Sequence, residues 1–346
     1  MKRLIGTAFS VALFCMAAEL PAQQTDSLSQ SYPEFLERHY LFKNVPDDRT
    51  AEWFEGLLAV HIPLRQNLQA VYDAVLIGDQ AAHGTVAWYF SMVTNLRMTK
   101  ESSAPVRTPS YMPKLTVTYF NVKRRESWTL PDSLPRTVRM WAFPFVPYGH
   151  YSNGQDGCLY ADQNPANDCA EPIMLLSPRQ VNRRDGSFSS HYMQLGAFYR
   201  RFALDQSLHM GSRPVARSYW SLGGQVRAYQ PYYWLGGGMS EELREVYGPT
   251  RVRGLWNSVS QRNGRLFGPG LLRYEVWVEG IFGAAPQVDP VRISLEVART
   301  MDRRSGWGVF ARGYHGQDDY NLGFLTNITV LQVGVTQSAE RMPTFR

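Results

Sequence analysis

A histidine and a serine two positions apart, His150 and Ser152, are the residues of this 346-residue chain whose types and spacing most directly suggest catalysis. If this segment is a β-strand, both side chains point to the same side of the sheet. A serine hydroxyl becomes an effective nucleophile when a neighbouring base takes its proton, and histidine suits that role near neutral pH. The following Asn153-Gly154 pair predicts a turn whose backbone N–H groups are available to an oxyanion. The non-catalytic alternative, a strand-end histidine and serine facing water, also fits, because this spacing is common.

The segments that must position these side chains read as β-strands, since short runs of alternating apolar and polar residues recur between turn residues. Residues 114–122 alternate most clearly, with Leu115, Val117 and Tyr119 on one face. No helical periodicity of comparable length competes. The strands predicted in this way are 57–62 (ended by Pro63), 114–122, 137–146, 191–202, 224–235, 271–281, 291–298, 306–314 and 327–336.

The N-terminus predicts export. Two basic residues, Lys2 and Arg3, precede an apolar run over 4–18 and small residues near 17–22, which is the order of a secretory signal peptide. We therefore expect a signal peptide over 1–22, an N-terminal extension over 23–45 and one domain over 46–346. Cys15 follows the bulky Phe14, which disfavours a lipoprotein site.

The composition favours a transmembrane barrel. No apolar run after residue 22 is long enough to span a membrane as a helix. Aromatic residues make up 13% of the chain, which has 28 glycines, yet the mean hydropathy is only −0.32. Barrels combine these properties because lipid-facing and lumen-facing residues alternate, and the length suits roughly 12 strands of about 9–11 residues. The predicted fold class is all-β, an antiparallel transmembrane β-barrel in an outer membrane; a soluble β-sandwich is the alternative.

The net charge bears on the kind of partner, and the cysteines bear on whether a disulfide forms. The net charge of +6 would suit nucleic acid, but an exported chain rarely meets it, so arginines near anionic lipid headgroups are the preferred explanation. Cys158 and Cys169 remain once the signal peptide leaves, an even pair in an exported chain. We expect them to form a disulfide.

The run from His150 through Ser152 to Gly154 resembles the active-site segment of the outer-membrane phospholipase A family. Further similarity follows in order along the chain. It includes paired aromatics at Trp88-Tyr89, a serine-rich loop at 101–107 followed by a Tyr-x-Pro strand entry at 111–115, and a closing strand with Asp319-Tyr320-Asn321, Asn327 and Val333-Gly334-Val335.

This resemblance implies a barrel of about 12 strands with the site on its outer wall, phospholipids as substrates, and a calcium-dependent homodimer as the active form. It makes His150 the base, Ser152 the nucleophile and the Gly154 N–H an oxyanion donor. It also implies calcium bound by the Gln155 carbonyl and the Ser187 hydroxyl. A serine of the partner subunit, matched by Ser102 or, as a second choice, Ser103, completes the site. Oxygen ligands of this kind suit calcium.

Two features depart from the family pattern. His191 stands where the family has an asparagine on the next strand. A neutral histidine could accept a hydrogen bond from His150 and orient it, whereas a charged one would oppose the imidazolium that must form there. The second departure is the segment 155–185, which replaces a shorter loop and holds the cysteine pair; we interpret it as a disulfide-closed surface loop that could instead cap the site or add calcium ligands.

Three functions remain open at this point. The first is a phospholipase of A1/A2 type, which hydrolyses acyl esters of glycerophospholipids. The second is a barrel resembling a lipid A deacylase, a chemistry that also uses a His-x-Ser pair on an outer wall. The third is a catalytically impaired or non-enzymatic outer-membrane barrel, which the histidine at 191 keeps open.

Overall fold

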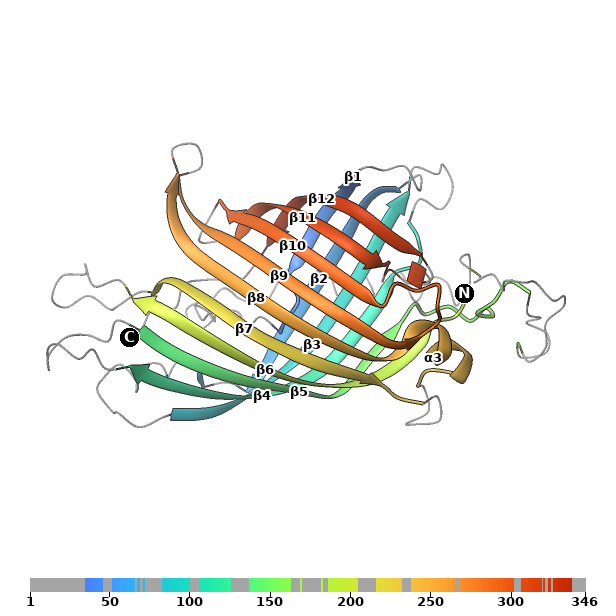
Figure 1. The fold of residues 1–346 in the computed structure, drawn as a ribbon, viewed down its shortest axis with the longest axis horizontal. Coiled ribbons are helices and arrows are strands. Elements are labelled where there is room, and N and C mark those ends of the chain that lie inside the picture. Colours follow the sequence, from blue (N-terminus) through green and yellow to red (C-terminus); the bar gives the residue numbers. More distant parts are fainter. Residues whose placement is uncertain are drawn as a thin grey trace, which may run out of the picture.

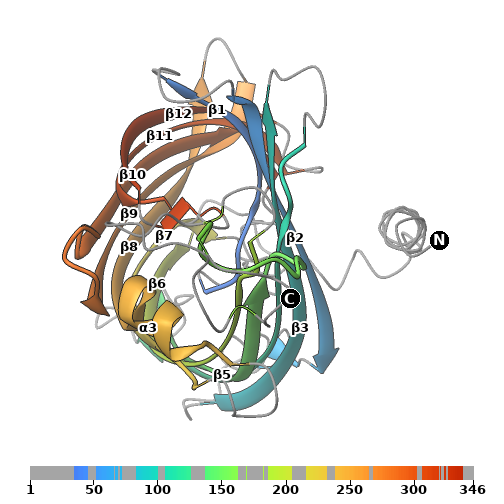
Figure 2. The same cartoon turned by 90° about the vertical axis from the view of Figure 1, so that its right-hand side faces the viewer.

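The strands form a closed antiparallel barrel (Figures 1 and 2). A computed structural model describes residues 35–45, 52–65, 67–68, 71, 83–99, 106–125, 137–162, 169, 182, 186–204, 216–231, 238–264, 268–301, 306–318, 320, 323–324 and 326–337. The predicted signal peptide over 1–22, and the extension as far as residue 34, lie outside these ranges.

The barrel has 12 strands, and each pairs with its neighbours in sequence while the first pairs with the last. This confirms the predicted fold class. The strands are β1 His39–Val45, β2 Glu52–Arg65, β3 His83–Thr99, β4 Ser110–Arg125, β5 Thr137–Ser152, β6 Ser189–Leu204, β7 Ala216–Tyr229, β8 Gly248–Gly264, β9 Gly268–Ala284, β10 Val291–Thr300, β11 Trp307–Gln317 and β12 Asn327–Gln337.

Several predicted boundaries differ from the observed ones. The strand β1 lies inside the predicted extension 23–45, because its backbone pairs with β12 from His39↔Gln337 to Val45↔Leu331 and so closes the barrel. The strand predicted over 224–235 is β7, which lies earlier in the chain. Pro63 does not end β2; it sits at a register irregularity facing β3, where a missing N–H is tolerated.

The outer wall is apolar and the inner wall is charged. Along β10, Ile293, Leu295 and Val297 are exposed, whereas the intervening Arg292 and Glu296 are buried. Leu295 is 56% exposed and Glu296 only 3%. This is the reverse of a water-soluble protein, and it is the pattern of a barrel whose outer wall faces lipid.

The segment 35–38 enters the barrel lumen. The Phe35 ring lies within 6.4 Å of the rings of Phe120 on β4 and Phe198 on β6, the two strands that flank β5. Its neighbours Glu37 and Arg38 form ion pairs with Lys114 at 2.5 Å and with Glu275 at 2.6 Å. Burial raises the pKa of the Glu37 carboxyl, but the positive charge of Lys114 outweighs this and lowers the pKa to about 2. Glu37 is therefore ionised at neutral pH and anchors the segment.

A short helix, α3 Glu241–Tyr247, lies at one end of the barrel between β7 and β8 (Figure 1). The Ser240 hydroxyl accepts a hydrogen bond from the Leu243 N–H at 3.3 Å and caps its N-terminus. Within the described ranges, no helix is long and apolar enough to cross a membrane. The same end of the barrel holds the connection from β5 to β6, which follows Ser152.

Candidate active site

His150 and Ser152 lie at the end of β5 on the outer wall of the barrel. The residue between them, Tyr151, points inward, where it is 4% exposed and lines the lumen. The side chains on either side of it therefore project outward, and both are half-buried. Residues two apart on one strand are separated by roughly 6.6 Å, which an imidazole that leans along the strand can bridge.

A β-bulge decides which way this pair faces. Trp141 and Phe143 are exposed on the outer wall, and strict alternation from them would place residues 150 and 152 in the lumen. The ladder of β5 with β6 instead shifts between Val146 and Gly149, and the ladder with β4 shifts opposite the same stretch. Val146 points inward and Tyr148 outward, so the extra residue reverses the alternation. The bulge contains Pro147, which has no N–H to contribute to the ladder.

The structure brings His191 beside His150. The two residues are direct partners in the β5–β6 ladder, and Ser152 is paired with Ser189. The ring centroids of His150 and His191 are 4.8 Å apart, and the rings are inclined at 58°. The predicted third residue therefore contacts the predicted base through its ring.

Tyr148 is a member of this cluster that the sequence did not single out. Its hydroxyl lies 2.9 Å from Nε2 of His191, within hydrogen-bonding distance, and the two ring centroids are 4.9 Å apart. Tyr148 is 37% exposed on the outer wall, whereas His191 is 5% exposed beneath it. The only sequence signal is that Tyr148 precedes His150 by two positions, the spacing of a shared strand face.

Asn153 fixes the turn that follows Ser152. Its buried side chain donates to the Gly186 carbonyl at 2.7 Å and accepts from the Phe188 N–H at 2.9 Å. Its backbone N–H also donates to the Phe188 carbonyl at 3.1 Å. Gly154 has φ +65, a left-handed conformation that glycine adopts without strain, and is exposed. This conformation leaves the Gly154 backbone exposed, where its N–H is available to an oxyanion near Ser152.

Comparisons with known proteins return one kind of fold. No family profile and no curated protein sequence matches the chain. Two solved structures are similar to it. Outer membrane phospholipase A from Escherichia coli is 12% identical over 90% of this chain and 96% of that chain, with a TM-score of 0.42. An active site mutant of that protein, at pH 6.1, is 12% identical over the same shares, with a TM-score of 0.45.

Gln155 and Ser187 come from two segments that run side by side. Asn153 pairs with Phe188 at one end of this contact, and the Ser187 N–H donates to the Gly157 carbonyl at 2.7 Å at the other. Their oxygens are neutral, and the described residues hold no group of three or more His, Cys, Asp or Glu side chains that could bind a metal ion. Neutral carbonyl and hydroxyl oxygens are acceptable calcium ligands, so this part of the donor set fits calcium. Ser102 and Ser103 lie outside the described residues.

Cys158 and Cys169 form a disulfide with a Cα–Cα distance of 5.5 Å. The connection from β5 to β6 is further tied by Asn182, whose backbone N–H donates to the Leu159 carbonyl at 2.8 Å and whose side chain donates to the Cys158 carbonyl at 3.2 Å. These bonds hold the described ends of the predicted insert 155–185 together next to Ser152.

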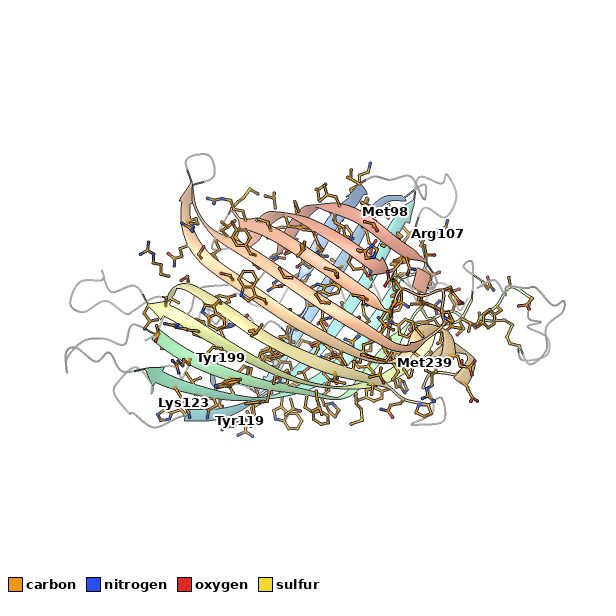
Figure 3. The ribbon with its side chains drawn as sticks, in the orientation of Figure 1. Met98, Arg107, Tyr119, Lys123, Tyr199 and Met239 are labelled. Atoms are coloured by element: carbon orange, nitrogen blue, oxygen red, sulfur yellow. A yellow bond between two sulfur atoms is a disulfide. The ribbon has the colours of Figure 1, made fainter. Side chains whose placement is uncertain are left out.

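The site lies near one edge of the apolar wall, and an aromatic row lies near the other. Trp141 packs against Tyr199 with ring centroids 4.8 Å apart, and Tyr199 packs against Trp220 at 5.4 Å. In Figure 3, Tyr119 and Tyr199 lie at the end of the barrel away from Met239, which shares an apolar cluster with Tyr151. The stretch from Trp141 to His150 rises about 20–25 Å along the barrel axis, given a strand tilt of ~40°, and this is close to the height of the apolar band of an outer-membrane barrel.

Proposed function

We propose that this protein is an outer-membrane phospholipase that hydrolyses acyl esters of glycerophospholipids, of A1/A2 type. One observation carries the proposal: His150 and Ser152 project together from the apolar outer wall, with His191 in ring contact from the next strand. The pair also lies at the edge of the apolar band, where the ester groups of a leaflet are found. A lipid reaches such a site laterally, within the membrane.

In the proposed reaction, Ser152 Oγ attacks the carbonyl carbon of the acyl ester while His150 accepts the hydroxyl proton. The tetrahedral oxyanion is stabilised by the Gly154 N–H, whose position depends on the Asn153 anchor. His150 then gives the proton to the leaving alcohol oxygen, which releases the lysophospholipid. Water, deprotonated by His150, then attacks the acyl carbonyl, and His150 returns this proton to Ser152 Oγ as the bond to the serine breaks and the fatty acid leaves.

His191 orients His150 in this scheme, and Tyr148 in turn orients His191. The Tyr148 hydroxyl at 2.9 Å from His191 Nε2 favours one placement of the ring and one tautomer. With Nε2–H donating to the hydroxyl, His191 is neutral and its Nδ1 is an acceptor for an N–H of His150. A neutral ring opposes the developing imidazolium of His150 far less than a charged one.

Calcium belongs to the proposal through the Gln155 carbonyl and the Ser187 hydroxyl, with Ser102 of a second copy of the chain completing the ligands. When bound, calcium would supply positive charge near the oxyanion. This arrangement makes the active form a calcium-dependent homodimer and leaves a monomer dormant, which protects the cell's own membrane.

The deciding experiment measures fatty acid release from phospholipid mixed micelles by the wild-type protein and by Ser152→Ala, each in calcium and in EDTA. We expect release by the wild type in calcium, and loss of at least about a thousandfold in the variant. Ser189→Ala is the matched control, since this serine pairs with Ser152 on the adjacent strand. Equal release from the wild type and Ser152→Ala contradicts the proposal. Serine-dependent release that persists in EDTA contradicts only the calcium part.

The same assay separates the alternatives. Acyl release from lipid A and none from glycerophospholipids would assign a deacylase, because the same hydroxyl and imidazole can attack either ester. No release from either substrate, with the barrel folded, would favour an impaired barrel in which His191 does not replace the family's asparagine.

A further inference from the structure

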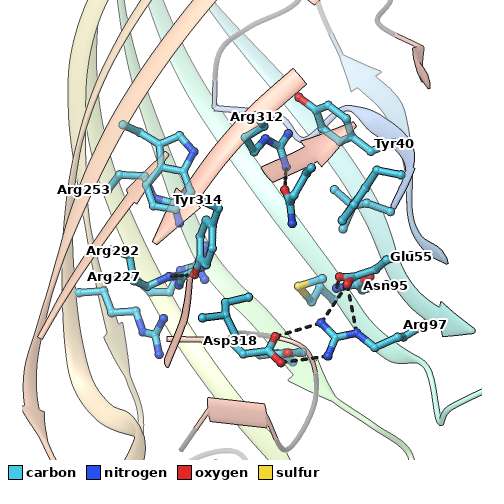
Figure 4. A pocket seen from close by; sticks show the side chains of 18 of the residues that line it. Tyr40, Glu55, Asn95, Arg97, Arg227, Arg253, Arg292, Arg312, Tyr314 and Asp318 are labelled. Atoms are coloured by element: carbon cyan, nitrogen blue, oxygen red, sulfur yellow. Dashed lines mark hydrogen bonds and ion pairs between the residues drawn. The ribbon is translucent and has the colours of Figure 1, made fainter. Parts of the chain in front are cut away.

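The barrel lumen contains a small cavity whose lining includes six arginines (Figure 4). Its volume is about 170 Å³, which suits a small ion with a few waters and is well below the ~300 Å³ at which pockets for larger organic ligands begin. The cavity lies inside the barrel, whereas His150 and Ser152 are on the outer wall, so the two regions are separate. The arginines that line it are Arg97, Arg227, Arg251, Arg253, Arg292 and Arg312.

On one side of the cavity, three arginines share a single carboxylate. Glu279 is paired with Arg253 at 2.7 Å, with Arg292 at 2.8 Å and with Arg251 at 3.3 Å. A fourth, Arg227, donates to two neutral oxygens, Gln194 Oε1 at 2.9 Å and the Tyr229 hydroxyl at 3.4 Å. Among the described residues, this side of the cavity carries three more positive charges than negative ones.

The rest of the lining does not cancel the surplus. Arg97 lies between Glu55 and Asp318, which leaves one excess negative charge. Arg312 and Arg273 share Glu296, which leaves one excess positive charge. These two contributions offset each other. Even without Arg292, the three residues Arg227, Arg251 and Arg253 carry two more positive charges than Glu279 does negative ones, and buried charge is costly unless it is paired.

Aromatic rings hold these guanidinium groups in place. The Arg227 guanidinium lies 4.4 Å from the centroid of the Tyr192 ring, Arg253 lies 4.4 Å from Trp277, and Arg251 lies 4.1 Å from Tyr247. Stacked guanidinium groups lose little further freedom when they bind, and their planar forks match the oxygens of phosphate or sulfate. The lining is thus both positively charged and preorganised.

We propose that this cavity binds a small multivalent oxyanion, inorganic phosphate being the probe of choice, held mainly by Arg227 and Arg253. Arg253 is the more accessible, with 24% of its side chain exposed, and Arg227 has neutral partners that an anion can replace or share. Binding there links β7 and β8 through one ligand, and so stabilises the barrel from inside.

The test uses the full-length protein in detergent, with phosphate binding followed by calorimetry and by the Tm. At equal ionic strength, phosphate and sulfate should raise the Tm in a saturable way and chloride should not. Equal shifts in all three salts would mean general screening and would overturn the proposal.

Three variants should change the affinity for phosphate in different directions. Arg227→Gln and Arg253→Gln should each weaken phosphate binding by about tenfold, because each removes a charged hydrogen-bond donor. Glu279→Gln removes the carboxylate that the described arginines share and should strengthen binding. Arg201→Gln, the same charge change on β6 at a position facing away from the lumen, is the control and should leave affinity unchanged. Unaltered affinity in both arginine variants, or weaker binding in Glu279→Gln, would contradict the assignment. If an arginine variant does not fold, the wild-type salt series and Glu279→Gln still decide.

Discussion

At the scale of single residues, the central feature is a pair of histidines in ring contact on the outer wall. His191 contacts the proposed base, His150, with 4.8 Å between the ring centroids. In the proposed reaction a neutral His191 orients this base, whereas a protonated one adds a positive charge beside the imidazolium that must form. The proton on His191 therefore connects the chemistry to pH.

His191→Asn tests this connection. A histidine can gain a proton on acidification and an asparagine cannot, so we expect wild-type hydrolysis to fall more steeply on acidification than hydrolysis by the variant. The measurement is kcat over roughly pH 5 to 9, with Ser152→Ala as the blank. Coincident pH profiles for the wild type and His191→Asn would show that protonation of His191 does not control hydrolysis.

Tyr148→Phe tests the next contact outward. The substitution removes the hydroxyl at 2.9 Å from His191 Nε2 but keeps the ring. One lost hydrogen bond of about 1 kcal/mol predicts a kcat roughly fivefold lower, with KM unchanged. The acidic limb of the pH profile should also move, since the tautomer of His191 is no longer fixed; a structural effect alone would not move it.

Tyr119→Phe is the matched control, because Tyr119 is on the outer wall at the other end of the barrel (Figure 3). Similar losses in both tyrosine variants would indicate a general effect of hydroxyls on the outer wall and would contradict a specific role for Tyr148.

At the scale of elements, the turn after Ser152 depends on one asparagine. The Asn153 side chain makes two bonds, of 2.7 and 2.9 Å, to the segment that leads into β6. Asn153→Ala should lower kcat by about 10- to 100-fold, because the Gly154 N–H is no longer held near the oxyanion and Phe188 N–H loses its acceptor.

The control for Asn153→Ala is Asn182→Ala, which removes another asparagine contact of the same connection, to the Cys158 carbonyl. Comparing kcat and Tm for both variants separates the two effects. A fall in Tm with unchanged kcat in Asn153→Ala would show that this residue serves stability alone.

The direction in which His150 and Ser152 face shows what strand alternation can predict from the sequence and what it cannot. Their spacing predicts that they share a face. Alternation from Trp141 and Phe143 puts that face in the lumen, and the bulge around Pro147 puts it on the outer wall. Proline is a visible signal for such a bulge, but its effect on register depends on both neighbouring strands. The His150–His191 pairing spans the long β5–β6 connection, and periodicity within each strand carries no information about it.

At the scale of the whole molecule, the barrel was predictable from its alternating segments, but some strands were not. No strand was predicted at β3 or β8, although each has 17 residues. In β8, Arg251 and Asn257 are buried in the lumen and Val252 and Trp256 are exposed. Such a segment is polar on average. Its two-residue alternation is recognised only when charged residues are accepted as facing the lumen. Charge pairing between neighbouring strands along the inner wall, from β8 to β11, is a tertiary property that no local window contains.

The reversed polarity of the two walls leads to a last prediction, for Leu195 on β6. Its side chain is 62% exposed, and it lies four residues from His191, about 10 Å deeper into the apolar band for a tilted strand. Arginine at an exposed site in water changes stability by only about 0.5 kcal/mol, whereas at the middle of a bilayer it costs about 2–4 kcal/mol. Leu195→Arg should therefore lower the free energy of unfolding in lipid vesicles by ~2–4 kcal/mol, measured by urea titration. Val106→Arg is the control, since Val106 is 48% exposed but precedes β4 at the end of the barrel. If the two variants were equally stable in vesicles, the wall around Leu195 would not face lipid, and a substrate could not reach Ser152 from the membrane.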